Sequence, residues 1–322
     1  MQKLIKAAVV AAITSLALAG CSPVTDLKTV VLVTHDSFAM SDELVHQFEH
    51  DSGYKLKVVK AGDAGAMTNK LILTKDQPIG DAVFGIDNTL IGLAKSNDLV
   101  SGDVQPIDFG DVCMNYDKDW FASRNMPVPS NISQLTSSTY KNLTVVENPA
   151  SSSTGMAFLI TTVAKFGEPG YLDYWKKLKA NGVKVTAGWE DAYFTEFSGS
   201  SGHGRYPIVL SYSSSPAYEV RENGKSQTAS ILNDCYRQTE YVGVLTGAKN
   251  HKGALALVNF MQSQEFQKAL PESMYVYPMS RDLELPSDWE KFAPAAITLA
   301  GQQLDVEAGR KGWITDWSHL FE

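Results

Sequence analysis

Aromatic and hydroxyl side chains follow several predicted strands in the second half of the chain, where they could bind a planar ring. These residues are Trp189, Tyr193, Tyr212, Tyr218 and Tyr275, with Ser214 in the serine run between two of the tyrosines. Aromatic faces attract planar and cationic groups, and one cation–π contact contributes about 0.5–2 kcal/mol. Each residue alone could instead pack in the core. As a set they predict a cage for a small cyclic ligand.

Two aspartates could supply negative charge to the same ligand. Asp36 directly follows a predicted buried strand at 29–33, and Asp87 follows another at 82–86. Strands and helices alternate in this region, which predicts a parallel α/β sheet with its ligand beyond the carboxyl ends of the strands. On that edge Asp36, its neighbour Ser37, and Asp87 could hold a cationic or amino-bearing ring.

A serine-rich turn could bind an anionic part of the ligand. The segment Ser151–Gly155 precedes a predicted helix at 156–166. The hydroxyls of Ser151, Ser153 and Thr154, together with the backbone N–H groups up to Gly155, could hold a phosphate or a hydroxyethyl tail. Ordinary N-capping by a single serine explains the same residues, and both interpretations stay open.

Familiar enzyme signatures are absent from the sequence, including the nucleophile elbow, the P-loop and the dinucleotide fingerprint. His35, Asp36 and Ser37 are the residue types of a hydrolase triad, but neighbours on an extended segment point in alternate directions. His46 and His50 are spaced for a shared metal on a helix, yet no third ligand motif is nearby. We therefore predict no catalytic residue, no metal and no cofactor.

The composition is that of a globular protein with more than one domain. The 322 residues suggest two domains, and 44% of them are hydrophobic. Lys and Arg number 28 against 36 Asp and Glu, which gives a formal net charge of −8. No basic stripe is visible, so the sequence argues against a nucleic-acid partner.

Residues 1–20 have the features of a secretion signal. Lys3 and Lys6 are followed by an apolar run too short to span a bilayer permanently, and small residues then precede Cys21. This order is typical of a bacterial lipoprotein signal. We expect cleavage before Cys21, lipidation of that cysteine, and a tether at 21–28. The protein would then be extracytoplasmic and anchored to a membrane, in the periplasm or at the cell surface.

Two further cysteines, Cys113 and Cys235, remain in the exported chain. Disulfides persist outside the cytoplasm, which favours a bridge. Two separately buried thiols are the alternative, because sequence spacing does not show that two cysteines are close in space.

The predicted elements continue the α/β pattern to the end of the chain, and a second unit begins near residue 115. Strands are predicted at 29–33, 56–59, 82–86, 107–116, 143–146, 183–185, 208–212 and 236–246. Helices are predicted at 42–50, capped by Ser41, and at 67–73, 156–166, 254–266 and 304–321.

The whole mature chain resembles the thiamine-binding components of bacterial ABC importers. These belong to the periplasmic-binding-protein superfamily, in the branch that also contains ferric-ion binders. The matching segments are His35–Ala39, Gly85–Asn88, Asp108–Gly110, Asn148–Gly155, Gly188–Tyr193, Leu210–Tyr218, Tyr275–Pro278 and Trp313–Trp317. The segments around Trp189 and from Tyr212 to Tyr218 are the most specific of these.

The resemblance implies an α/β fold of two lobes that are joined by crossover strands, with the ligand in the cleft between them. The first lobe would comprise 29–109 and 241–322, and the second lobe 110–240. Cys113 and Cys235 would both lie near the hinge, which favours their pairing. Ring stacking is implied for Trp189, Tyr193, Tyr212 and Tyr218, polar contacts to the rings for Asp36 and Asp87, and contact with the hydroxyethyl or phosphate end for Ser151–Gly155.

The implied function is non-enzymatic. A monomer would capture thiamine, one of its phosphates or a related pyrimidine, and deliver it to an ABC permease. A ferric-ion or other small-solute binder of the same superfamily is one alternative, although Tyr212 and Tyr218 are six positions apart rather than adjacent. A thiamine-processing enzyme is another. It would need Cys113 as a nucleophile, which a disulfide to Cys235 would exclude.

Overall fold

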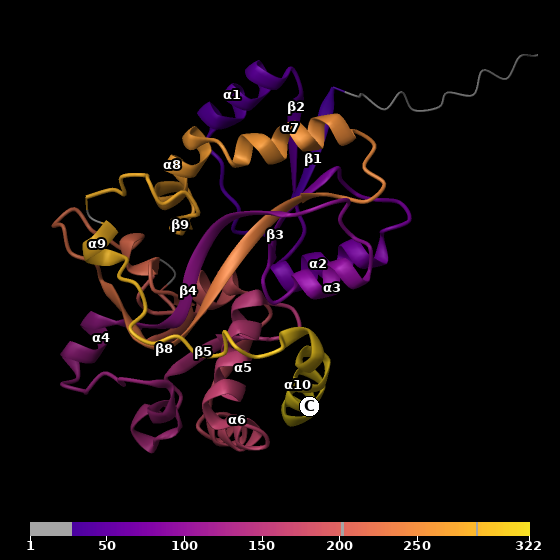
Figure 1. Cartoon of the computed structure of the whole chain (residues 1–322). Coiled ribbons are helices and arrows are strands. Elements are labelled where there is room, and N and C mark those ends of the chain that lie inside the picture. Colours follow the sequence, from indigo (N-terminus) through magenta and orange to yellow (C-terminus); the bar gives the residue numbers. More distant parts are fainter. Residues whose placement is uncertain (1–27, 201–202, 288) are drawn as a thin grey trace, which may run out of the picture.

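Two long antiparallel strands, β4 (Gln105–Asp117) and β8 (Thr228–Val244), cross the middle of the molecule and join two α/β lobes (Figure 1). The computed structural model describes residues 28–200, 203–287 and 289–322. The strand order in the sheet is β2-β1-β3-β8-β4-β7-β5-β6, with β9 paired to β4. This is the two-lobed architecture that the sequence predicted.

The first lobe is built on the parallel strands β1, β2 and β3, with β3 antiparallel to β8. Its core contains Leu32, Phe84 and Val242 from the sheet and Phe48 and Leu257 from the helices. Its elements are β1 (Thr29–Thr34), α1 (Asp42–Ser52), β2 (Lys55–Lys60), α2 (Ala64–Leu73), β3 (Ala82–Asp87), α3 (Ile91–Ser96), α7 (His251–Met261), α8 (Gln264–Ser273) and β9 (Tyr277–Pro278).

The second lobe has β7 between β4 and β5, and a core in which α5 and α6 cover the sheet. Trp175, Phe158 and Tyr174 are buried at its centre. Its helices and strands are α4 (Lys118–Ser123), β5 (Thr144–Glu147), α5 (Ser153–Phe166), α6 (Gly170–Ala180), β6 (Lys184–Thr186), a π-helix (Asp191–Glu196), β7 (Ile208–Tyr212) and α10 (Val306–Phe321), with 3-10 turns at Ile132–Thr136, Ser138–Tyr140 and Ser215–Ala217. The short helix α9 (Trp289–Phe292) follows β9 in the chain.

The C-terminal helix α10 differs from the predicted division of the chain. It packs beside α5 and α6 (Figure 1), where the ring of Trp317 lies 5.6 Å from that of Trp175. The expectation that 241–322 belongs entirely to the first lobe therefore needs correction. After β9 the chain returns to the second lobe, because the tryptophans of α10 find their apolar partners on α6.

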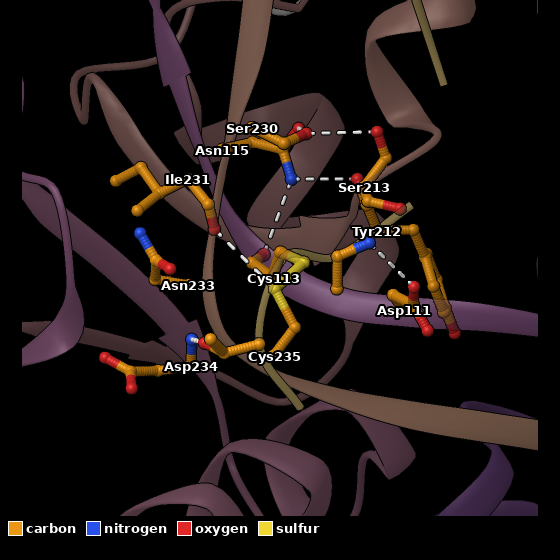
Figure 2. Close-up of a disulfide and its surroundings, with 12 residues drawn as sticks. Asp111, Cys113, Asn115, Tyr212, Ser213, Ser230, Ile231, Asn233, Asp234 and Cys235 are labelled. Atoms are coloured by element: carbon orange, nitrogen blue, oxygen red, sulfur yellow. Dashed lines mark hydrogen bonds between the residues drawn. A yellow bond between two sulfur atoms is a disulfide. The ribbon is translucent and has the colours of Figure 1, made fainter. Parts of the chain in front are cut away.

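A disulfide joins the two crossover strands, as the sequence favoured. Cys113 in β4 and Cys235 in β8 are bonded, with a sulfur–sulfur distance of 2.04 Å, and both side chains are buried. Figure 2 shows the bond in its setting, with Asn115 of β4 and Ile231 of β8 close to it. The pairing of β4 with β8 is irregular between Val112 and Met114, so several residues of β8 lie opposite Cys113.

Most predicted elements are present, with shifted ends. The strand at 208–212 has the predicted bounds, and Ser41 caps α1 by accepting a hydrogen bond from the Leu44 N–H. The helix predicted at 254–266 is divided into α7 and α8, because Ser263 caps a new helix. Helix α6 was not predicted.

The signal segment, Cys21 and the tether up to residue 27 lie outside the described residues. Within the part of the chain that the structure describes, no helix is long and apolar enough to cross a bilayer.

Candidate ligand-binding cleft

A cavity of about 830 Å³ lies between the lobes and is lined by both. The first lobe contributes the segments after β1 and before α2. The second lobe contributes the start of α5, the region around Trp189 and the end of β7, and Glu240 of β8 forms part of the lining. The last residue of α8, Ser273, and the three residues after it complete the wall. Polar strand ends from both lobes therefore meet in one space, as expected for parallel α/β sheets.

Aromatic rings line one wall of the cavity. The ring of Trp189 stacks on Tyr193 with centroids 5.0 Å apart and an interplanar angle of 17°, and Tyr212 lies 6.4 Å from Trp189. The Trp189 indole N–H donates to the Ser211 hydroxyl at 2.8 Å, which fixes the ring. Tyr218, with 45% of its surface exposed, presents the most accessible ring of this wall. The wall offers π-faces to a planar solute.

Tyr212 depends on a glycine in the neighbouring crossover strand. A Cβ atom at Gly110 would lie 2.6 Å from Cδ1 of the Tyr212 ring, so only glycine allows this ring to lie flat against β4. Burial, followed by the charge of Glu240, holds the pKa of Tyr212 well above its usual value. The phenol therefore stays neutral and acts as an aromatic surface and a hydrogen-bonding group.

Charged side chains also line the cavity. His35 follows β1 and its Nε2 lies 3.3 Å from Oε1 of Glu240. Burial alone would lower the pKa of His35, but the carboxylates of Glu240, Asp63 and Asp36 together outweigh it, and the pKa is raised. Asp108 faces Glu240 across the β4–β8 register. Burial and the charge of Glu240 hold the pKa of Asp108 well above its usual value.

Asp63 connects the two lobes at one edge of the cleft. In its own lobe it caps α2, with Oδ1 accepting from the Ala64 N–H at 2.7 Å. The same carboxylate accepts from two N–H groups of the second lobe, that of Ser153 at 3.1 Å and that of Trp189 at 2.9 Å. The lobes approach closely here, because a Cβ atom at Gly65 would lie 2.7 Å from the Ser151 carbonyl carbon.

The serine-rich turn Ser151–Gly155 is engaged mostly with the protein itself. The Ser152 hydroxyl accepts from the Gly155 N–H, so a serine caps α5. The Ser153 N–H is bound to Asp63, and the Thr154 hydroxyl donates to Glu147 at 2.9 Å. The capping interpretation thus describes the structure. The anion-binding interpretation is weakened, because the Ser153 N–H already donates to the Asp63 carboxylate.

Most of the predicted ligand-binding residues do line the cavity. They are Asp36, Ser37, Ser151, Ser153, Thr154, Trp189, Tyr193, Tyr212, Tyr218 and Tyr275. The structure places these residues around one cavity, and we propose below that they contact a ligand there.

The prediction needs correction for three residues, Asp87, Ser214 and Gly155, which do not line the cavity. Asp87 is fully buried, and its Oδ1 accepts from the N–H and the hydroxyl of Thr89, so it shapes the turn into α3. The Ser214 hydroxyl donates to the Tyr275 carbonyl oxygen at 2.6 Å. Gly155 faces the Glu147 carbonyl oxygen inside the lobe. Each of them follows a strand or a helix cap as predicted, but the local turn directs it away from the cavity.

The sequence did not single out four acidic residues of the cavity lining, Asp63, Glu190, Asp191 and Glu240, and two of them show why. Asp63 stands in a glycine-rich loop, and its position before α2 is an N-cap signal that could have located it. Glu240 lies inside a crossover strand, where a single carboxylate in an alternating pattern gives no signal of its own.

Comparison with known proteins identifies the family. Residues 86–296 match the family described as bacterial extracellular solute-binding protein. The chain belongs to this family. Its fold and its class as a binding protein, not an enzyme, are therefore as predicted, and it functions outside the cytoplasm.

Relatives of this solute-binding protein cover nearly its whole length. The thiamine-binding periplasmic protein of Salmonella typhimurium is 30% identical over 92% of this chain and 95% of its own length. That of Escherichia coli is 28% identical, over 92% and 94%. A solved periplasmic thiamin binding protein has a TM-score of 0.81 at 25% identity and covers 91% of this chain and 96% of its own. Iron-bound HitA from Pseudomonas aeruginosa shares the fold with a TM-score of 0.69 at 17% identity, over 90% and 99%.

Proposed function

We propose that this solute-binding protein captures thiamine in the interlobe cleft and delivers it to an ABC permease. Thiamine combines a planar aminopyrimidine with a cationic thiazolium ring. One observation carries the proposal: a stacked aromatic wall and a surplus of carboxylates line the same cavity. The thiamine-binding relatives that match over nearly the whole chain support it.

The charges of the cavity suit a cation. Its lining includes five carboxylate residues, which are Asp36, Asp63, Glu190, Asp191 and Glu240. The basic groups of the lining are Lys60 and His35. The Lys60 ammonium donates to the Asp36 carbonyl oxygen, and His35 is paired with Glu240. A cation entering this space gains from the remaining negative charge, because attraction strengthens where water is excluded.

Thiamine monophosphate and thiamine pyrophosphate carry the same two rings, so the proposal includes them as solutes. Their phosphate groups would reach the region of Ser151 and Thr154 in the cavity wall. Asp63 already accepts a hydrogen bond from the Ser153 N–H and would oppose a phosphate there. The affinities of the three forms measure how strong this opposition is.

The competing functions fit this cavity less well. Among the described residues no group of three or more His, Cys, Asp or Glu side chains is arranged to hold a metal ion. Burial raises the pKa of Tyr193 and of Tyr212 well above the usual value, which opposes the phenolate form that ferric iron prefers. Cys113 is bonded to Cys235, so the enzyme alternative lacks its nucleophile.

The lipid anchor and the permease belong to the same proposal. Cys21 would carry the lipid, and the short segment before β1 would connect it to the first lobe. Metabolic labelling with a fatty acid tests the anchor, and a Cys21→Ser variant should lose both the label and the membrane association. Labelling that persists in this variant would contradict the assignment.

Calorimetry and thermal melting of the mature chain test the ligand. A specific solute should raise the unfolding midpoint by mass action, with about 2.7 kcal/mol of stabilisation at one hundred times the dissociation constant. Trp189→Ala should remove most of the shift, whereas Trp120→Ala, on α4 of the second lobe outside the cavity lining, should keep it. No heat and no shift with any of the three thiamine forms would rule out the proposed ligand.

A further inference from the structure

Three titratable side chains form a row that begins at the cavity and continues behind its lining, and ring stacking does not account for them. His35 lies at the end of β1, Glu240 in β8 and Asp108 in β4. The His35 Nε2 is 3.3 Å from the Glu240 carboxylate, and Asp108 is directly opposite Glu240 in the strand register. His35 and Glu240 line the cavity, whereas Asp108 lies behind them with 1% of its surface exposed.

The position of the His35 ring is built into the sheet. Gly85 in β3 has a φ of +96°, and a Cβ atom there would lie 2.2 Å from Cδ2 of the imidazole. The ring also contacts Phe84, with centroids 5.6 Å apart. Only glycine leaves room for the imidazole against the strand, so Gly85 holds it beside Glu240.

The charges along the row follow from burial. Two facing carboxyls in a water-poor site cannot both ionise without a large cost. Burial and the neighbouring Glu240 raise the pKa of Asp108 well above its usual value, so Asp108 keeps its proton beside Glu240. His35, with a raised pKa, then supplies the positive charge that balances Glu240.

We propose that Glu240 is the counter-ion of the solute's cationic ring, and that protonated His35 takes this role in the free protein and loses its proton when the solute enters. This inference rests on the proposed function, because it needs a solute with a fixed positive charge. Glu240 is the carboxylate in contact with His35, so a cationic ring that binds beside Glu240 competes with the imidazolium for the same counter-ion. His35 is the partner that can give up its charge.

Other ionisable groups face His35. If His35 is to release the proton, these groups must keep their own protonation states. Asp36 and Asp63 face it from the first lobe, and both favour its protonation. The Lys60 ammonium donates to the Asp36 carbonyl oxygen, and the Tyr212 hydroxyl of β7 lies near Glu240 and Asp63. Asp87 is opposite Glu240 in the β3–β8 register and is a second group that could supply a proton, because burial raises its pKa to about 7.

Calorimetry with thiamine in two buffers of different ionisation enthalpy counts the protons released on binding. Where His35 is protonated in the free protein, release should approach one proton, and affinity should rise up to about tenfold per pH unit. The neutral isostere 3-deazathiamine, with thiophene in place of thiazolium and the same aminopyrimidine, should release none. Equal release with both ligands would overturn the inference and needs no variant.

Variants assign the two roles. His35→Gln should abolish the proton release and flatten the pH dependence, whereas His50→Gln on the exposed face of α1 should change neither. Glu240→Gln should weaken thiamine by tenfold or more and leave 3-deazathiamine within about threefold, since one buried charge-assisted contact is lost. Proton release that survives in His35→Gln would overturn the role of His35 and point to a carboxyl such as Asp87.

The same data separate the inference from the proposed function. If thiamine does not bind at all, the proposed function fails. If thiamine binds tightly but exchanges no proton between pH 6 and 8, the function stands and the His35–Glu240 exchange is rejected.

Discussion

Asp63 in the first lobe accepts a 2.9 Å hydrogen bond from the backbone N–H of Trp189 in the second lobe. Because the same carboxylate also caps α2 and accepts from the Ser153 N–H, it holds two lobes and one aromatic binding residue in a single arrangement. The bond therefore links closure of the cleft to the position of the ring that we propose stacks on the solute.

Removal of this link should favour the open arrangement. In Asp63→Ala the two interlobe N–H groups lose their acceptor, and a buried donor left without a partner costs about 1–3 kcal/mol. We expect weaker thiamine binding, by roughly tenfold or more, with a faster dissociation rate. Small-angle scattering with saturating thiamine should show a larger radius of gyration than for the parent. Asp173→Ala, on the exposed side of α6, is the matched control and should behave as the parent does.

The buried Asp87 carboxyl should make stability depend on pH. Burial raises its pKa to about 7, whereas an unfolded aspartate titrates near pH 3.9. Between these values the folded protein keeps a proton that the unfolded chain has lost, so the free energy of unfolding falls as pH rises through this window.

Asp87→Asn removes that penalty and keeps an oxygen for Thr89. Relative to the parent it should gain about 2–4 kcal/mol at pH 8 and nothing near pH 4. Urea unfolding at both values measures the difference. An equal effect at the two pH values would show that Asp87 is ionised in the folded protein.

The Cys113–Cys235 disulfide should stabilise the hinge without contributing to the binding surface. Neither cysteine lines the cavity, and the bond closes a loop of 122 positions. Loss of a long-loop disulfide costs about 2–5 kcal/mol. The Cys113→Ala/Cys235→Ala protein should melt at a lower temperature and bind thiamine with nearly unchanged affinity. Thiol titration of the denatured, unreduced parent should find neither thiol free.

The C-terminal helix should be part of the second lobe's stability. Trp317 is 2% exposed and packs edge-on against Trp175. Trp317→Ala removes a large buried side chain and should cost about 3–5 kcal/mol. Leu73→Ala, at an 86% exposed position in the first lobe, should cost little. If Trp317→Ala left the unfolding midpoint unchanged, α10 would not belong to the folded core of that lobe.

Elements that depend on neighbouring residues were predicted correctly, and an element that depends on distant contacts was missed. Thr29–Thr34 and Ile208–Tyr212 were located because β-branched and apolar runs report a buried strand directly. The capping of α1 by Ser41 is likewise local. Helix α6 was missed, since its burial depends on contacts with α5 and α10 that lie far away in the chain.

The functional side chains show the same difference. Trp189, Tyr193 and Tyr212 were recognised as a set by type and position, and they line the cavity together. Asp87 was chosen by the same rule of strand ends, yet its side chain turns into the lobe to bind Thr89. Residue type and strand order locate the edge of a sheet, but the direction of each side chain depends on the turn that follows.

The sequence by itself determined the α/β class, the family resemblance and the aromatic character of the site, because these depend on periodicity and on motifs of neighbouring residues. Only the tertiary structure decided that Asp63 bridges the lobes, that His35 pairs with Glu240, and that α10 returns to the second lobe. These contacts join residues from distant parts of the chain, and their formation depends on how the two crossover strands bring the lobes together.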